Sequence, residues 1–245
     1  MAGAYTMLAR GARLAAGVLF ATAVLVGRAH AVEEGEAHLF TYLQADQLEY
    51  RLGGEDTFSW DIRGWIGGDF RKLWVKTQGD DVLDGDLARA ELQVLYSRLV
   101  AAYWDVQLGV RYDAKPDPSR GFAVVGLHGL APYFIEVDAA AFVSHHGDLS
   151  GRVEAESDLW FTQRLIVSPS IELDAAFQSV PELEIESGIG SVELGLRIRY
   201  EIVRELAPYI GVSMEQKIGQ TADRARRRGN DVVATTLVAG IRWWF

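Results

Sequence analysis

The chain has 245 residues, no cysteine, and 34 acidic against 24 basic side chains, for a formal net charge of −10 with histidine neutral. Because cysteine is absent, disulfide scaffolds, thiolate metal sites and cysteine nucleophiles are excluded. The acidic balance disfavours nucleic acid as a partner and favours cations.

The amino terminus has the three parts of a secretory signal peptide. Two arginines precede an apolar run at 14–26, and Ala-His-Ala at 29–31 supplies a small-x-small cleavage site. The run is too short to span a bilayer, which takes about 20 apolar residues. We therefore expect a cleaved signal peptide at 1–31, a short periplasmic segment at 32–39 and a main domain at 40–245.

From about residue 40 to the end, apolar and polar residues alternate with period two, and helical spacing is nowhere sustained. This alternation predicts an all-β domain of about 12 strands. We place the strands near 40–50, 59–67, 72–78, 87–98, 104–113, 121–129, 133–143, 150–160, 164–177, 189–204, 207–218 and 232–245.

The two faces of the predicted strands differ sharply in polarity. The clearest strand has Trp104, Val106, Leu108, Val110 and Tyr112 on one face and Asp105, Gln107, Arg111 and Asp113 on the other. The polar faces of four further strands are charged throughout: Arg89, Glu91, Gln93 and Arg98; Glu136 and Asp138; Arg152, Glu154, Glu156 and Asp158; Glu193, Arg197, Arg199 and Glu201.

A soluble β-sandwich would show similar alternation with its apolar face turned inward, but three features favour a transmembrane barrel. The last strand carries Leu237, Ala239, Ile241, Trp243 and Phe245 on one face and stops at that aromatic residue, which resembles the assembly signal of outer-membrane barrels. The strand number is even. The connections alternate in length, with long polar ones at Arg51–Phe58, Gly79–Asp86, Ala114–Arg120, Ser144–Leu149, Gln178–Gly188 and Gly219–Asp231.

We therefore predict a closed, antiparallel, up-and-down barrel in the outer membrane of a Gram-negative cell, with short periplasmic turns and longer extracellular loops. Closure is expected because an open edge in lipid leaves backbone groups unpaired. Leu-Ala-Pro-Tyr occurs at 130–133 and again at 206–209, each time in a predicted periplasmic turn that leads into a strand. Pro169 falls inside a predicted strand and is interpreted as a bulge or a late strand start.

Six ordered blocks of the sequence resemble the copper resistance protein B family, the outer-membrane barrels of bacterial copper-resistance operons. The blocks are Tyr42–Tyr50, Trp65–Asp69, Lys72–Thr77, Glu91–Arg98, Gly129–Phe134 and Ala207–Val212. The resemblance runs from about Phe40 to Phe245. It implies copper as the ion bound or moved at the outer membrane, and it implies a periplasmic copper-handling oxidase of the same system as a candidate partner.

The chain departs from the family in one respect. Longer members carry a Met- and His-rich segment before the barrel, with the soft ligands that suit copper. Here that region is only 32–39, and Met214 is the one methionine that remains after signal cleavage. We therefore do not expect sequestration of copper by such a tail.

Acidic side chains predicted for the barrel interior are the first candidate metal ligands. They are Asp46, Glu49, Asp61, Asp69, Glu91, Asp105, Glu136, Asp138, Glu154, Glu156, Glu172, Glu193 and Glu215, interleaved with Arg63, Lys76, Arg89, Arg111, Arg152 and Arg197. We single out Glu136, Asp138, Glu154, Glu156, Glu91 and Asp105 as candidates. The alternative is an ordinary salt-bridged lumen, since a small barrel must fill its interior.

Histidines are the second group of candidates, because imidazole suits Cu(II) better than carboxylate does. His145 and His146 are adjacent in a predicted extracellular loop beside Asp148, where they form either a Cu(II) site or a solvated loop. His128 lies near a predicted periplasmic turn, and its side chain faces either the lumen or the membrane interface. In the last predicted loop, Arg224, Arg226, Arg227 and Arg228 are either solvated or in contact with lipopolysaccharide phosphates.

No metalloprotease, phosphate-loop or nucleophile-elbow motif occurs, so we do not expect an enzyme. The favoured function is a copper-resistance barrel that binds copper or passes it across the outer membrane. The rival is a passive element, either a narrow non-specific pore or a membrane anchor for a periplasmic copper-handling protein.

Overall fold

The computed structural model describes residues 39–53, 56–83, 85–180 and 186–245. The predicted signal peptide and residues 32–38 lie outside these ranges. The strands are β1 (Phe40–Leu52), β2 (Thr57–Gly67), β3 (Arg71–Val82), β4 (Leu87–Ala101), β5 (Trp104–Lys115), β6 (Arg120–Ala131), β7 (Ile135–Ser144), β8 (Leu149–Ser157), β9 (Leu159–Trp160), β10 (Leu165–Ala176), β11 (Gly188–Tyr200), β12 (Leu206–Lys217) and β13 (Val233–Trp244). A 3-10 turn, η1 (Pro132–Phe134), precedes β7, and the helix α2 (Gly219–Arg228) precedes β13.

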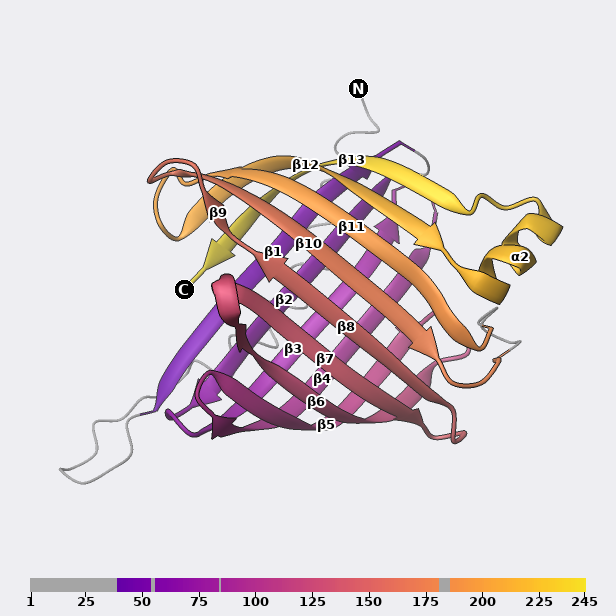
Figure 1. The fold of residues 1–245 in the computed structure, drawn as a ribbon, viewed down its shortest axis with the longest axis horizontal. Helices are drawn as coiled ribbons and strands as arrows, with labels where there is room; N and C mark the ends of the chain where they lie inside the picture. Colours follow the sequence, from indigo (N-terminus) through magenta and orange to yellow (C-terminus); the bar gives the residue numbers. More distant parts are fainter. Residues whose placement is uncertain (1–38, 54–55, 84, 181–185) are drawn as a thin grey trace.

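The strands form one antiparallel sheet that closes on itself, because β13 pairs with β1. β8 and β9 both pair with β10 and are separated only by Asp158, so together they make one wall strand. The barrel therefore has 12 strands, as the sequence predicts. In Figure 1, β10 and β11 on one wall run across β2 and β3 on the opposite wall, which is the strand tilt that closure requires.

The two ends of the barrel differ in their connections. We call one the turn end; its connections are 68–70, 102–103, 132–134, 161–164 and 201–205. The other is the loop end, with 53–56, 83–86, 116–119, 145–148, 177–187 and 218–232. Four loop-end connections are shorter than predicted because the flanking strands continue into them; β3, for example, reaches Val82. Helix α2 lies beyond the strand ends at the loop end, opposite the carboxyl terminus (Figure 1).

Apolar side chains face outward and polar ones face the lumen, which confirms the predicted orientation. Leu108, Val110 and Leu194 are exposed on the outer wall, whereas Gln107 and Arg197 are buried inside. Aromatic residues exposed around the turn end, including Phe70, Tyr103, Tyr133, Phe134 and Phe161, match the interfacial belt of membrane barrels. Within the described ranges, no helix has the length and apolar character needed to cross a membrane.

Two predicted inner-face residues lie elsewhere. Arg98 is on the outer face, because it has the same parity as Tyr96, and it pairs across the sheet with Arg71 at the turn end. Asp69 is exposed in the 68–70 turn and does not reach the lumen.

The two Leu-Ala-Pro-Tyr segments have different structures. Tyr133 belongs to η1, has a φ of 67° and is 89% exposed. Tyr209 lies within β12 and is only 4% exposed inside the barrel. The second segment therefore lies in a strand, in agreement with the predicted strand at 207–218, and only the expectation that both copies of the tetrapeptide form a turn is wrong.

Pro169 is neither at a bulge nor at a late strand start. β10 begins at Leu165, and Pro169 pairs in register with Leu196 of β11. On the other side of β10 the ladder is interrupted between Ser157 and Leu159, opposite the proline. A residue without an N–H is tolerated there because the neighbouring strand itself is broken.

The inner face is not charged throughout, because one row of in-register positions is apolar. This apolar row consists of Trp65, Trp74, Leu95, Gly109, Val124 and Phe142, one from each of β2 to β7. Gly109 is in register with Leu95 and Val124, and the position requires glycine because a Cβ there would lie 2.0 Å from the carbonyl oxygen of Val94. The row packs against one wall, so the polar side chains gather in the rest of the lumen.

Candidate functional site

A second row of in-register positions runs through the lumen across seven wall strands. We call it the acidic row; it consists of Asp105, His128, Asp138, Glu154, Glu172, Glu193 and Glu215, each directly opposite the next. Asp105 is the second residue of β5 at the turn end, and Glu215 is near the end of β12 at the loop end. Because barrel strands are tilted, a row perpendicular to them climbs from one end to the other.

Like charges directly opposite one another in a sheet are destabilising, so the acidic row needs positive charge nearby. Arg152 supplies part of it, with Nε 3.3 Å from Glu172 and 3.0 Å from Asp174. Arg51 on β1 approaches Glu193 on β11 at 3.1 Å. Lys72 pairs with Asp105 and Lys76 with Asp138, so four basic side chains partner the six carboxylates of the row, which stays acidic overall.

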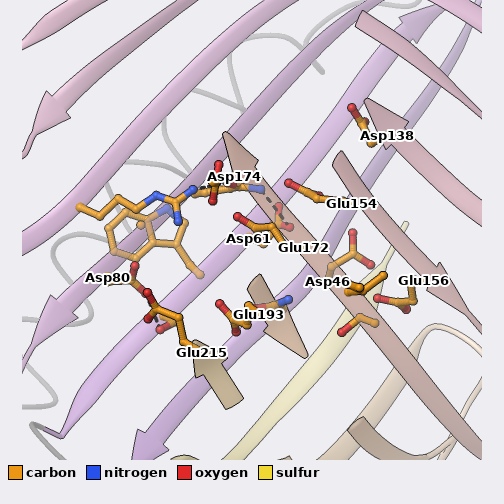
Figure 2. A pocket seen from close by; sticks show the side chains of 18 of the residues that line it. Asp46, Asp61, Asp80, Asp138, Glu154, Glu156, Glu172, Asp174, Glu193 and Glu215 are labelled. Atoms are coloured by element: carbon orange, nitrogen blue, oxygen red, sulfur yellow. Dashed lines mark hydrogen bonds between the residues drawn. The ribbon is translucent and has the colours of Figure 1, made fainter. Parts of the chain in front are cut away.

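The middle of the row faces a central cavity of about 220 Å³. Eleven acidic side chains line this cavity and only four arginines do, namely Arg51, Arg63, Arg89 and Arg197. Figure 2 shows ten of the acidic side chains converging on it from different strands: Asp46, Asp61, Asp80, Asp138, Glu154, Glu156, Glu172, Asp174, Glu193 and Glu215. Lys76, Arg152 and Arg242 also pair with lining carboxylates, and the excess of negative charge that remains attracts cations to the middle of the lumen.

A second cavity, of about 330 Å³, lies at the turn end. Asp105 and His128 line it, so the side chain of His128 faces the lumen. His128 Nδ1 is 3.3 Å from Asp138 Oδ2, and its ring contacts the edge of Trp74 at 5.2 Å between centroids. Lys72 pairs with Asp105 at 3.1 Å. This cavity is thus less acidic than the central one.

One ion pair borders both cavities. Arg63 on β2 donates to Glu136 on β7 at 2.6 Å, across the width of the barrel, and both residues line both cavities. Arg63 also pairs with Asp46. The Arg63–Glu136 pair therefore stands between the turn end and the centre of the lumen.

The structure brings only some of the candidate ligands together. Glu136, Asp138, Glu154 and Glu156 line the central cavity, and Asp105 and His128 line the turn-end cavity. Glu91 is buried among Arg89, Arg111 and Arg152, at 3.6, 2.9 and 3.4 Å, and lines neither cavity. Over the ranges that the structure covers, no group of three or more His, Asp or Glu side chains is arranged to hold a metal ion.

His145 and His146 lie apart from the lumen row, in the 145–148 connection at the loop end. Their rings are 4.0 Å apart between centroids and both are exposed. Asp148 is engaged elsewhere, by Arg120 at 2.7 Å and Ser144 at 3.1 Å. The hydrogen bond from Gln178 is the largest cause that lowers the pKa of Asp148. Asp148 is therefore an ionised partner of its own loop rather than a third ligand.

Two cavity residues were not among the acidic side chains predicted for the lumen. Asp80 was assigned to a loop because the predicted strand ended at 78, whereas β3 continues to Val82. Asp174 follows Glu172 at the same parity in β10, and this spacing could have placed it on the inner face.

Comparison with known proteins gives the family. Residues 39–245 match the family model described as copper resistance protein B precursor (CopB). The chain is 40% identical over 217 residues to copper resistance protein B of Escherichia coli, covering 88% of this chain and 72% of that protein. It is 39% identical over 206 residues to a copper resistance protein B homolog of Pseudomonas syringae pv. tomato, covering 84% and 70%.

Among solved structures, the NanC porin superposes with a TM-score of 0.53 at 11% identity, over 83% of this chain and 99% of the porin. At this identity the likeness concerns the fold alone, and it agrees with a closed outer-membrane barrel. Neither the family nor this fold is known as enzymatic. The chain belongs to the copper resistance protein B family, as an outer-membrane β-barrel of a copper-resistance system.

Proposed function

We propose that the barrel passes copper ions across the outer membrane through its lumen, along the acidic row. The observation that carries the proposal is the excess of negative charge at the central cavity, where eleven acidic side chains are partnered by the four lining arginines and by Lys76, Arg152 and Arg242. The acidic row places one acidic or histidine side chain on each of seven neighbouring wall strands, from the turn end to the loop end. A cavity lined by one sign of charge raises the local concentration of the opposite ion.

The donor atoms favour hydrated Cu(II). Carboxylate oxygens and the imidazole of His128 are hard or borderline ligands, whereas Cu(I) prefers sulfur. Met214 has the same parity as the exposed Ile210 and Val212 and so lies on the outer face, away from the lumen. Carboxylates that are paired with arginines hold an ion weakly, and this suits passage because an ion must also leave each position.

The proposal includes the cellular setting. We expect export by the signal peptide at 1–31, with the turn end facing the periplasm. There the turn-end cavity, with Asp105 and His128, is the position from which copper would be exchanged with a periplasmic copper-handling oxidase.

The test neutralises three members of the acidic row together, Glu154→Gln, Glu172→Gln and Glu193→Gln. We expect the cation-over-anion permeability ratio of the reconstituted barrel to fall about tenfold, which corresponds to about 1.4 kcal/mol at the cavity. The measurement is the reversal potential in a planar bilayer under a salt gradient. The fold is expected to persist, because Arg152 still has Asp174 as an ion-pair partner and Arg51 still has Glu49.

The matched control removes the same number of charges outside the lumen, with Asp86→Asn, Asp117→Asn and Asp231→Asn, all exposed at the loop end. Copper survival of a deletion strain complemented with each variant is measured in parallel. The proposal requires that the lumen variant lose copper tolerance and that the control keep it. Equal tolerance in both strains would favour the membrane anchor, and equal passage of anions by the native barrel would favour a non-specific pore.

A further inference from the structure

Helix α2 presents a basic surface in an otherwise acidic protein. Its ten residues carry four arginines and one aspartate, whereas the chain as a whole has a net charge of −10. No residue of α2 lines the central cavity or the turn-end cavity. A basic surface would repel cations, so these arginines serve a purpose other than cation passage.

The packing of α2 determines which arginines face outward. Ala222 and Ala225 are buried against the barrel, where α2 contacts β11. Arg224 is held by Glu186 at 2.6 Å. Arg226 and Arg227 are exposed.

The exposed arginines of the last turn, Arg226, Arg227 and Arg228, form the surface that we call the basic turn, in which Arg228 also interacts within the protein. Arg226 pairs with Asp223 at 3.0 Å, but these side chains are 64% and 58% exposed. A pair so exposed contributes little, and it leaves most of the guanidinium donors facing outward. Cations near a helix carboxyl end also offset its dipole, but one such residue suffices for that purpose.

The position of the basic turn relative to the outer wall points to a lipid partner. Ile189 on β11 and Val233 on β13 are outward apolar residues, each about half exposed, at the loop-end termini of the strands that α2 contacts or precedes. The two longest connections, 177–187 and 218–232, are both at the loop end, as extracellular loops are. The basic turn therefore lies beside the outer leaflet, at the level of its head groups.

We propose that the basic turn binds the phosphate groups of the phosphorylated glycolipid of the outer leaflet, lipopolysaccharide. The planar guanidinium donates paired hydrogen bonds to phosphate oxygens, and this geometry is specific to arginine. Basic clusters next to a membrane-embedded segment bind anionic head groups in the same way. This proposal does not depend on copper passage, and the two can fail separately.

The experiment uses the full-length barrel in nanodiscs and measures its affinity for diphosphoryl lipid A. In the test variant Arg226, Arg227 and Arg228 become Gln, which is also a good helix former. We expect affinity to fall on the order of 100-fold, since each arginine near an anionic surface contributes a factor of about five. The matched control, Arg71→Gln, Arg98→Gln and Arg204→Gln, removes three exposed arginines at the turn end and should retain native affinity.

Two further measurements separate the possible outcomes. Dephosphorylated lipid A should bind the native barrel as weakly as diphosphoryl lipid A binds the test variant, and triple Arg→Lys should recover only part of the loss. The proposal is overturned if the test variant and the control bind equally. It is also overturned if inorganic pyrophosphate binds as tightly as the lipid, because the site would then recognise free phosphate. Resistance of the folded barrel to detergent on an unheated gel confirms that each variant is folded.

Discussion

Replacing Arg63 with glutamine is expected to raise the cation conductance of the reconstituted barrel about three- to tenfold. Arg63 borders both cavities, so its positive charge lies on the path between them. One charge about 6 Å from a passing ion corresponds to this factor at effective dielectric constants of about 80 to 40. Single-channel recording in symmetric salt measures the effect.

The partner variant should have the opposite sign. Glu136→Gln removes the carboxylate that holds Arg63 at 2.6 Å and leaves the positive charge on the path, so cation conductance should fall. Lys72→Gln is the matched control, because Lys72 lines only the turn-end cavity and should give a smaller rise. If Arg63→Gln and Lys72→Gln have the same effect, the position of Arg63 between the two cavities does not control cation passage.

Replacing Glu49 with glutamine is expected to lower the free energy of unfolding of the barrel by about 3–5 kcal/mol. Glu49 is 0% exposed. Its carboxylate accepts two hydrogen bonds from Arg197, both 3.0 Å, and one from Tyr209, also 3.0 Å. The substitution leaves the Arg197 guanidinium buried without its carboxylate. Urea titration of the barrel in lipid vesicles, followed by tryptophan fluorescence, measures the change.

Asp223→Asn is the matched control for Glu49, because Asp223 pairs with Arg226 at the same 3.0 Å but both side chains are more than half exposed. An exposed pair of this kind contributes at most about 1 kcal/mol. Burial, rather than distance, therefore predicts the difference between the two variants. Equal losses for the two substitutions would mean that the Glu49 network is solvated and does not stabilise the wall.

The fold was predicted from properties that are local to each strand. Alternation such as Val106, Leu108 and Val110 against Asp105 and Gln107 depends only on the period of two residues per pleat. The solvent then requires closure, because lipid cannot satisfy an open edge. Errors arose where alternation gave no signal, as at the end of β3, or where a short motif was compared without its context. Leu-Ala-Pro-Tyr is a turn at Tyr133 and a strand at Tyr209 because tertiary packing overrides so short a segment.

The candidate site was predicted only in part. The sequence by itself determined that Asp138, Glu154, Glu172 and Glu193 lie on inner faces, and which family the chain resembles. Only the tertiary structure decided that these residues stand opposite one another, that Arg63 reaches Glu136 across the lumen, and that Glu91 is enclosed by arginines. The physical reason is register: the face of a residue depends on its own strand, whereas its neighbours depend on the shear and closure of the whole barrel.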